Sequence, residues 1–190
     1  YFVTGATGFI GRYLVQSLLQ RGKGTIYVLV RPKSVGKLDE LREFWGKDSV
    51  KRVVPIKGDL GSPKLGVSPA DVRKLKGKVK HFFHLGAVYD IEASAETMKK
   101  ANIVGTQGAL DLAAAVSAGC FHLVSSIAAA GLYRGTFTED MFEEAEGLDH
   151  PYHSTKHDSE GMVRANGRIP YRIYRPGAVV GHSKTGFIDK

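Results

Sequence analysis

Short runs of β-branched and aromatic residues alternate along the chain with longer segments whose apolar residues recur at helical spacing. The short runs predict strands at residues 1–5, 25–31, 52–59, 80–86, 120–126 and 171–176. The longer segments predict helices at residues 9–21, 37–45, 69–75, 95–117 and 152–166. This alternation is typical of βαβ units, and their right-handed crossovers build a doubly wound parallel sheet, so we predict an α/β fold. Ligands of such sheets bind at the carboxyl ends of the strands.

The helix predicted at residues 95–117 shows its periodicity most clearly. Ile103, Ala109, Leu110 and Ala113 are among its apolar residues at helical spacing. Gly119 follows the last periodic residue, and glycine is the usual residue just beyond a helix C-terminus. We therefore expect Gly119 to end this helix.

Length and composition are those of a globular domain. The 190 residues suit one hydrophobic core, and 43% hydrophobic with 24% charged residues is close to the globular average. No apolar run approaches the roughly 18 to 20 residues of a membrane span. Cys120 is the only cysteine, so no disulfide can form within the chain, and we expect a cytoplasmic protein. Because the chain begins abruptly inside an apolar run, we expect it to be part of a longer polypeptide.

The formal net charge of +8 favours an anionic partner. Lysines and arginines are scattered, and the sequence has neither a basic stripe with interleaved aromatic residues nor a helix-turn-helix pattern. We therefore expect no nucleic-acid partner and favour a polyanionic cofactor.

Three glycines in TGATGFIG, residues 4–11, follow the first predicted strand and open the first predicted helix. Gly5 permits a tight turn, Gly8 lets the backbone approach a pyrophosphate, and Gly11 lets helix and strand pack closely. The helix N-terminus then offers free N–H groups and a positive dipole end to the phosphates. This context predicts a dinucleotide site of the Rossmann type rather than an ordinary turn. The spacing of the glycines resembles that of the extended short-chain dehydrogenase/reductase family.

The end of the second strand distinguishes NAD from NADP, because an acidic residue there binds the ribose 2′-hydroxyl of NAD. Arg31 and Lys33 occupy this point, and the first carboxylate is Asp39. A guanidinium can hold a 2′-phosphate through two charge-assisted hydrogen bonds, whereas a carboxylate would repel it. We predict NADPH rather than NADH, with solvated loop cations as the alternative.

Tyr152 and Lys156 in YHSTK are four residues apart, which places both side chains on one face of a helix. A neighbouring ammonium stabilises a phenolate and lowers the pKa of the phenol from its reference value of about 10. The pair can therefore serve as an acid or base, and the lysine can also hold the nicotinamide ribose. Its position after the fifth strand of a dinucleotide-binding fold makes a catalytic pair the better interpretation.

The resemblance implies further site residues. Aligning the family pattern S-x-x-x-x-G on Gly131 selects Ser126 as the hydroxyl that donates to the substrate oxygen, with Ser125 as the alternative. Asp59 would contact the adenine amino group, and Gly86 stands where the family usually has alanine. The complete set expected at the cofactor is Thr4, Gly5, Thr7, Gly8, Phe9, Ile10, Gly11, Arg31, Lys33, Asp59, Leu60, Leu85, Gly86, Ala87, Asn102, Tyr152, Lys156, Pro176 and Gly177.

Residues 125–164 and 171–183 resemble bacterial fatty acyl-CoA reductases and the related thioester reductases. The resemblance implies NADPH-dependent reduction of a fatty acyl thioester or fatty aldehyde, with the substrate-binding portion beyond residue 190. A homo-oligomer is compatible with it. A sugar-nucleotide epimerase or dehydratase of the same extended family would share the cofactor residues but commonly holds NAD, against which Arg31 counts. A non-catalytic dinucleotide sensor would be expected to lack the Tyr152–Lys156 pair.

The remaining polar clusters carry simpler interpretations. His153 and His157 are four apart, but no third ligand follows in helical register, so we expect no metal site. His81 and His84 are three apart on a strand and should point to opposite faces. The acidic run at residues 138–150 is expected to be a solvated loop or short helix, and a lid over the substrate is the alternative.

Overall fold

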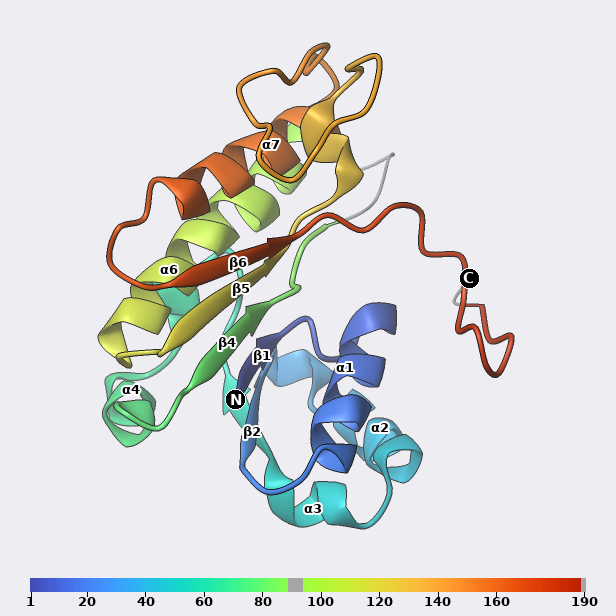
Figure 1. Cartoon of the computed structure of the whole chain (residues 1–190). Helices are drawn as coiled ribbons and strands as arrows, with labels where there is room; N and C mark the ends of the chain where they lie inside the picture. Colours follow the sequence, from blue (N-terminus) through green and yellow to red (C-terminus); the bar gives the residue numbers. More distant parts are fainter. Residues whose placement is uncertain (89–93, 189–190) are drawn as a thin grey trace.

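The computed structural model describes residues 1–88 and 94–188 of the chain. This part contains a parallel sheet of six strands in the order β3-β2-β1-β4-β5-β6 (Figure 1). The strands are β1 (Phe2–Thr4), β2 (Ile26–Val30), β3 (Val53–Lys57), β4 (His81–His84), β5 (Cys120–Val124) and β6 (Tyr171–Tyr174). The order is that of the Rossmann fold, so the predicted doubly wound sheet is confirmed.

The helices connect these strands. They are α1 (Phe9–Gln20), α2 (Lys37–Trp45), α3 (Asp48–Arg52), α4 (Pro69–Leu75), α5 (Ala95–Lys99), the π-helical turn η3 (Lys100–Val104), α6 (Gly105–Ala115) and α7 (Pro151–Arg164). Short 3₁₀ turns are η1 (Pro32–Ser34), η2 (Pro63–Gly66) and η4 (Ile127–Ala130). Within the described ranges, no helix combines the length and apolar character needed to cross a membrane.

Successive residues of the central strands enter two separate hydrophobic cores. On β1, Phe2 packs in the core that includes residues of α4, α6 and α7, whereas Val3 packs in the core that includes residues of α1 and α2. On β2, Leu29 packs in the same core as Phe2, and Val28 packs in the same core as Val3. Figure 1 shows the two groups of helices on opposite sides of the sheet. The sheet is therefore buried on both faces at its centre, which explains the nearly continuous apolar runs of these strands.

Two details differ from the prediction. Helix α3 was missed because its five residues, Asp48–Arg52, are too few to show a helical period. The segment predicted as one helix at residues 95–117 consists of α5, η3 and α6. Gly119 does not end it: Ser117 takes the left-handed conformation, with φ 55°. The lack of a side chain at Gly119 instead allows close packing, because a Cβ there would lie 2.9 Å from the Lys80 carbonyl oxygen.

Candidate active site

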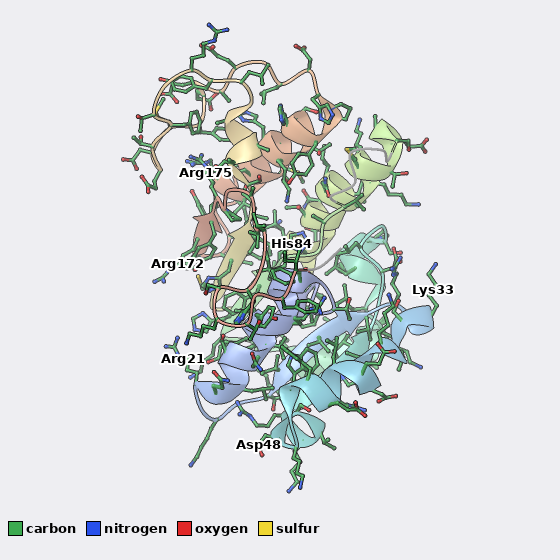
Figure 2. The ribbon with its side chains drawn as sticks, turned by 90° about the vertical axis from the view of Figure 1, so that its right-hand side faces the viewer. Arg21, Lys33, Asp48, His84, Arg172 and Arg175 are labelled. Atoms are coloured by element: carbon green, nitrogen blue, oxygen red, sulfur yellow. The ribbon has the colours of Figure 1, made fainter. Side chains whose placement is uncertain are left out.

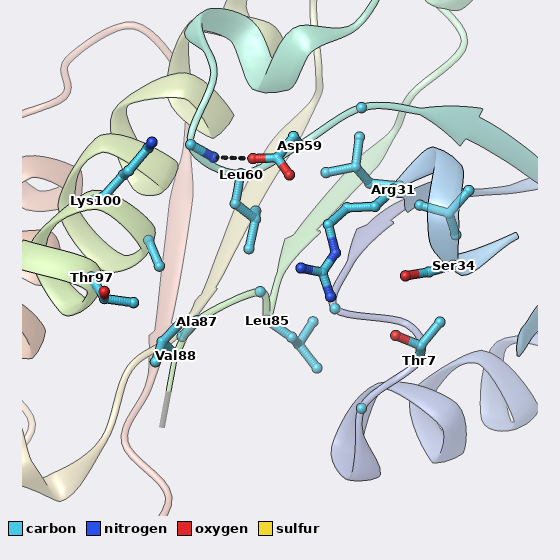
Figure 3. Close-up of a pocket in the computed structure, with 18 residues that line it drawn as sticks. Thr7, Arg31, Ser34, Asp59, Leu60, Leu85, Ala87, Val88, Thr97 and Lys100 are labelled. Atoms are coloured by element: carbon cyan, nitrogen blue, oxygen red, sulfur yellow. Dashed lines mark hydrogen bonds between the residues drawn. The ribbon is translucent and has the colours of Figure 1, made fainter. Parts of the chain in front are cut away.

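A pocket of about 430 Å³ lies at the carboxyl ends of β1 to β4, where the strand order changes direction between β1 and β4 (Figure 3). This is the place at which doubly wound sheets bind their ligands. Many of the residues expected at the cofactor line it: Gly5, Thr7, Gly8, Arg31, Asp59, Leu60, Leu85, Gly86 and Ala87. Four separate loops of the predicted site therefore meet in one cavity.

The three glycines of the first loop have different structural roles. Gly5 has φ 71°, and a Cβ there would lie 2.8 Å from the Gly86 nitrogen. A Cβ on Gly11 would lie 2.0 Å from the Gly5 carbonyl oxygen, so helix and loop pack too closely for any side chain. Gly8 lines the pocket and is the N-cap of α1, where no side chain caps the helix. The N-terminus of α1 is thus open to an anion at Gly8.

The contrast between Gly11 and Gly8 gives a testable prediction. Gly11→Ala forces a methyl group against the backbone, so we expect the free energy of unfolding to fall by about 1–3 kcal/mol. Gly8→Ala is the matched control, because its Cβ would meet the Gly5 oxygen at an ordinary 3.4 Å. It should unfold within about 1 kcal/mol of wild type but bind dinucleotide more weakly, since its methyl group faces the pocket. Urea unfolding and calorimetric titration with NADPH measure both effects; equal stability of the two variants would contradict the packing role of Gly11.

Arg31 and Lys33 differ in position although both follow β2. Figure 3 shows the Arg31 guanidinium extending into the pocket, whereas Figure 2 places Lys33 at the outer surface. Lys33 is not among the pocket residues. In the described part of the chain no carboxylate forms an ion pair with Arg31. Of the two predicted cations, Arg31 is therefore the one placed to meet an anionic group in the pocket.

Asp59 and Leu60 form the opposite wall. Asp59 accepts a hydrogen bond from the Gly61 nitrogen at 2.9 Å, so it is a turn carboxylate as well as a pocket residue. Leu60 lies close to Gly86: a Cβ at that position would be 2.8 Å from the Leu60 Cδ1 atom, so an alanine there would require the Leu60 side chain to shift.

Thr4 lies beneath the pocket rather than in its wall. Its hydroxyl oxygen accepts from the Leu85 and Gly86 nitrogens at 3.2 and 3.0 Å and lies 2.8 Å from His84 Nδ1. Since the oxygen accepts twice, its proton is donated to Nδ1, and His84 Nε2 donates to the Thr106 hydroxyl at 3.2 Å. Burial, with a smaller contribution from Lys156, lowers the pKa of His84 to about 3, so the ring is neutral. Thr4 thus fixes the end of β4. His84 and His81 point to opposite faces as predicted: His84 contacts Phe121 of one core, whereas His81 contacts Phe83, which packs against the other core.

Lys156 lines a second cavity beside the pocket, a void of only about 10 Å³. This cavity shares Gly86 and Ala87 with the pocket and is also lined by Asn102 and Lys156. Lys156 is only 7% exposed, and its ammonium donates to the Val124 carbonyl oxygen at 3.4 Å. Burial lowers the pKa of Lys156 to about 8. A cation with so little hydrogen bonding is expensive to bury, which is a common property of functional sites.

Asn102 belongs to the π-helical turn η3 and joins two elements. Its side chain accepts from the Val88 nitrogen at 2.9 Å and donates to the Thr155 hydroxyl at 3.2 Å. Asn102 therefore holds the segment after β4 against α7, the helix that carries Lys156. Single π-helical turns are frequent at functional sites.

The two candidate serines have different surroundings. Ser125 is buried, and its hydroxyl donates to Glu160 Oε2 at 2.9 Å. Ser126 is half-buried, and its oxygen accepts from the Ala128 nitrogen at 3.1 Å, which leaves the hydroxyl proton available for a ligand. The geometry favours Ser126 over Ser125 as the donor.

The other predicted residues line neither cavity. Tyr152 is half-buried in the first turn of α7, and its backbone nitrogen donates to His150 Nδ1 at 3.1 Å. The Pro176 carbonyl oxygen accepts from the Ile127 nitrogen at 3.1 Å, so the segment after β6 lies beside the residue that follows Ser126. The predicted residues that line neither cavity are Thr4, Phe9, Ile10, Gly11, Lys33, Ser126, Tyr152, Pro176 and Gly177.

Sequence reasoning missed part of the pocket wall: Leu29, Val30, Ser34, Gly58, Gly61, Val88, Thr97, Lys100 and Ala101. Val30 and Gly58 lie at the carboxyl ends of predicted strands, so the strand-end rule could have found them. Thr97 and Lys100 reach the pocket from α5 and η3, and no local signal marks them. Among residues 1–88 and 94–188, no cluster of three or more His, Cys, Asp or Glu side chains could hold a metal ion.

The fold and the comparisons place the chain in the extended short-chain dehydrogenase/reductase family, whose domains are of the NAD(P)-binding type. Residues 3–190 match the family model described as Male sterility protein, and the chain belongs to this oxidoreductase family. It is 35% identical, over 99% of its length, to a linear gramicidin synthase of Brevibacillus parabrevis. It is 30% identical, over 94% of its length, to the candidate fatty acyl-CoA reductase CG8306 of Drosophila melanogaster.

A solved structure has the same fold. The terminal R domain from the myxalamid PKS-NRPS biosynthetic pathway superimposes with a TM-score of 0.87, at 33% identity over 99% of this chain. The chain spans 51% of that structure, 43% of the Drosophila protein and 4% of the gramicidin synthase polypeptide. It therefore corresponds to a portion of each relative.

Proposed function

We propose that the chain is the cofactor-binding and catalytic portion of an NADPH-dependent reductase that acts on an acyl thioester or fatty aldehyde. The observation that carries this proposal is the position of Lys156 directly beside the pocket. The phosphate-binding features and Arg31 line the pocket, and Gly86 and Ala87, which also line it, border the small void that Lys156 lines. A dinucleotide bound in the pocket would extend from Arg31 toward Gly86 and Ala87, beside the helix that carries Tyr152 and Lys156.

The residues present fit NADPH. Gly5 and Gly8 leave backbone exposed where a Cβ would otherwise stand, and α1 offers an N-terminus without a side-chain cap. Arg31 would hold the 2′-phosphate, and Asp59 with Leu60 would border the adenine. When bound, the reduced nicotinamide supplies a hydride to the carbonyl carbon of the substrate.

The chain's own residues would manage the developing negative charge. The Ser126 hydroxyl donates to the carbonyl oxygen, and Tyr152 transfers its phenolic proton to that oxygen as the carbonyl is reduced. Lys156, in its protonated form, stabilises the resulting phenolate and binds the ribose. Reduction of a thioester in this way yields a hemithioacetal, which breaks its carbon–sulfur bond to give an aldehyde and a thiol.

The substrate class is supported by the relatives rather than by an acyl-binding residue of this chain. One relative bears the name of a fatty acyl-CoA reductase, and the resemblance of residues 125–164 points in the same direction. The test is a panel of acyl-CoA, fatty aldehyde and nucleotide-sugar substrates with NADPH or NADH, followed by the loss of nicotinamide absorbance in the full-length protein. Turnover of only the nucleotide sugar would contradict the proposal.

The cofactor preference has its own prediction. Arg31→Ala should weaken NADPH binding by about 10- to 100-fold, because two charge-assisted hydrogen bonds to the 2′-phosphate are lost, and NADH binding by less than about threefold. Calorimetric titration with each nucleotide measures the ratio. Lys33→Ala should have the smaller effect, since Lys33 lies outside the pocket. A larger effect at Lys33, or equal losses for both nucleotides, would contradict the role of Arg31.

A further inference from the structure

We infer that Glu160 is a positioning residue for the proposed catalytic centre, acting with Arg175 to fix the place of Ser126. The inference rests on the proposed function and extends it to two residues that touch neither cavity. Arg175 directly precedes Pro176 and Gly177, and Glu160 lies one helical turn after Lys156.

Glu160 is a completely buried carboxylate with an unusually full set of partners. Arg175 binds it with two nitrogens: Nη2 lies 2.6 Å from Oε1, and Nε lies 3.1 Å from Oε2. Arg164 Nε donates to Oε1 at 3.0 Å, and the Ser125 hydroxyl donates to Oε2 at 2.9 Å. Burial alone would raise the pKa of Glu160, but the hydrogen bonds from Arg175, Ser125 and Arg164 outweigh it and lower the pKa. Glu160 is therefore ionised at neutral pH.

Two partners of Glu160, Ser125 and Arg175, are adjacent to residues of the proposed site. Ser125 ends the strand segment that delivers Ser126, and the Ser125 nitrogen donates to the Tyr174 carbonyl oxygen at 2.8 Å. Arg175 begins the segment whose Pro176 oxygen is bonded to the Ile127 nitrogen. One carboxylate on α7 thus ties the ends of β5 and β6 to the helix that carries Tyr152 and Lys156.

The same network holds the acidic segment of residues 138–150. Arg175 Nη1 and Nη2 donate to the carbonyl oxygens of Thr138 and Met141 at 3.0 and 2.7 Å. Arg164 Nη2 donates to the backbone carbonyl oxygen of Glu139 at 3.3 Å. Figure 2 shows Arg175 at the base of this loop, beside α7. Arg175 and Arg164 therefore anchor this loop by its backbone. The loop ends at the start of α7, two residues before Tyr152.

Stability is a weak reason for such an arrangement, because a buried ion pair is often replaceable by apolar side chains at no loss. An arginine–carboxylate pair with several bonds instead fixes orientation. A displacement of about 1 Å at a reacting group can cost about 100-fold in rate. Glu160 is suited to prevent that displacement at Ser126.

The test is a double-mutant cycle in the full-length protein. Glu160→Gln keeps the shape of the side chain and removes its charge, and we expect kcat to fall by about 10- to 100-fold, with the Kd for NADPH changed by less than about threefold. In a Ser126→Ala background the same substitution should lower kcat by less than about threefold, because there is no hydroxyl left to misplace. Asp111→Asn is the control: it breaks the exposed ion pair with Arg168 at 3.3 Å and should leave kcat unchanged.

If Glu160→Gln does not fold, Ser125→Ala removes only the bond between the carboxylate and the residue that follows β5, and it should show the same dependence on the Ser126 hydroxyl with a smaller loss. Equal losses in both backgrounds, or full activity of a folded Glu160→Gln protein, would overturn the inference and leave the proposed function intact. If Ser126→Ala itself retains full activity, the role proposed for Ser126 fails, and the inference fails with it.

Discussion

Tyr152→Phe should lower the rate of carbonyl reduction by about 10²- to 10⁴-fold, the usual contribution of a general acid. The phenyl ring keeps the shape of the side chain but has no proton to give to the substrate oxygen. Tyr152 lines neither cavity, so the Kd for NADPH should change by less than about threefold. Single-turnover measurement of nicotinamide oxidation, together with calorimetric titration, separates the two quantities.

The control for this variant is Tyr171→Phe, which alters an exposed tyrosine at the start of β6, at the opposite end of the strand from the site. It should retain full activity. A Tyr152→Phe protein that reduces substrate at the wild-type rate would remove Tyr152 from the proposed mechanism, and Ser126 would then be the remaining hydroxyl donor.

Lys156→Met should stabilise the cofactor-free protein while abolishing its activity. Burial lowers the pKa of Lys156 from 10.5 to about 8, and at about 1.4 kcal/mol per unit the protonated side chain costs up to about 3 kcal/mol at neutral pH. Methionine has a similar volume and carries no charge, so the free energy of unfolding at pH 7 should rise by up to that amount. Active sites commonly trade stability for function in this way.

The pH dependence gives an independent check. Between about pH 8 and 10.5 the lysine is neutral in the folded state but protonated in the unfolded state. The unfolded state therefore binds more protons, and wild-type stability attributable to Lys156 rises with pH in this window. His84, with a pKa of about 3, does not titrate there. Urea unfolding at pH 7 and pH 10 should show the advantage of Lys156→Met shrinking by about 2 kcal/mol; an advantage independent of pH would contradict the lowered pKa.

Local sequence patterns were sufficient for the fold and for the phosphate-binding loop. The glycines of residues 4–11 are recognisable because a strand, a tight turn and a helix follow one another within a few residues. The Tyr152–Lys156 pair is recognisable because four residues complete one helical turn. The residues that follow each strand could likewise be predicted to meet at one site, since parallel strands present their carboxyl ends at one edge of the sheet.

The choice between neighbouring residues required the tertiary structure. The family pattern selects Ser126 and leaves Ser125 as the alternative; the two differ physically because Glu160, 35 residues further along the chain than Ser125, accepts a hydrogen bond from Ser125. Arg31 and Lys33 are both cations after β2, but the turn η1 directs only Arg31 into the pocket.

The sequence by itself therefore determined the order of elements and the glycine loop after β1, and it supplied the side chains that we propose to react, because these depend on spacings of a few residues. Only the tertiary structure decided which hydroxyl is available, how deeply Lys156 is buried and that Thr97 and Lys100 border the pocket. Burial and hydrogen-bond partners depend on contacts between segments far apart in the chain, so they cannot be predicted from the periodicity of any one segment.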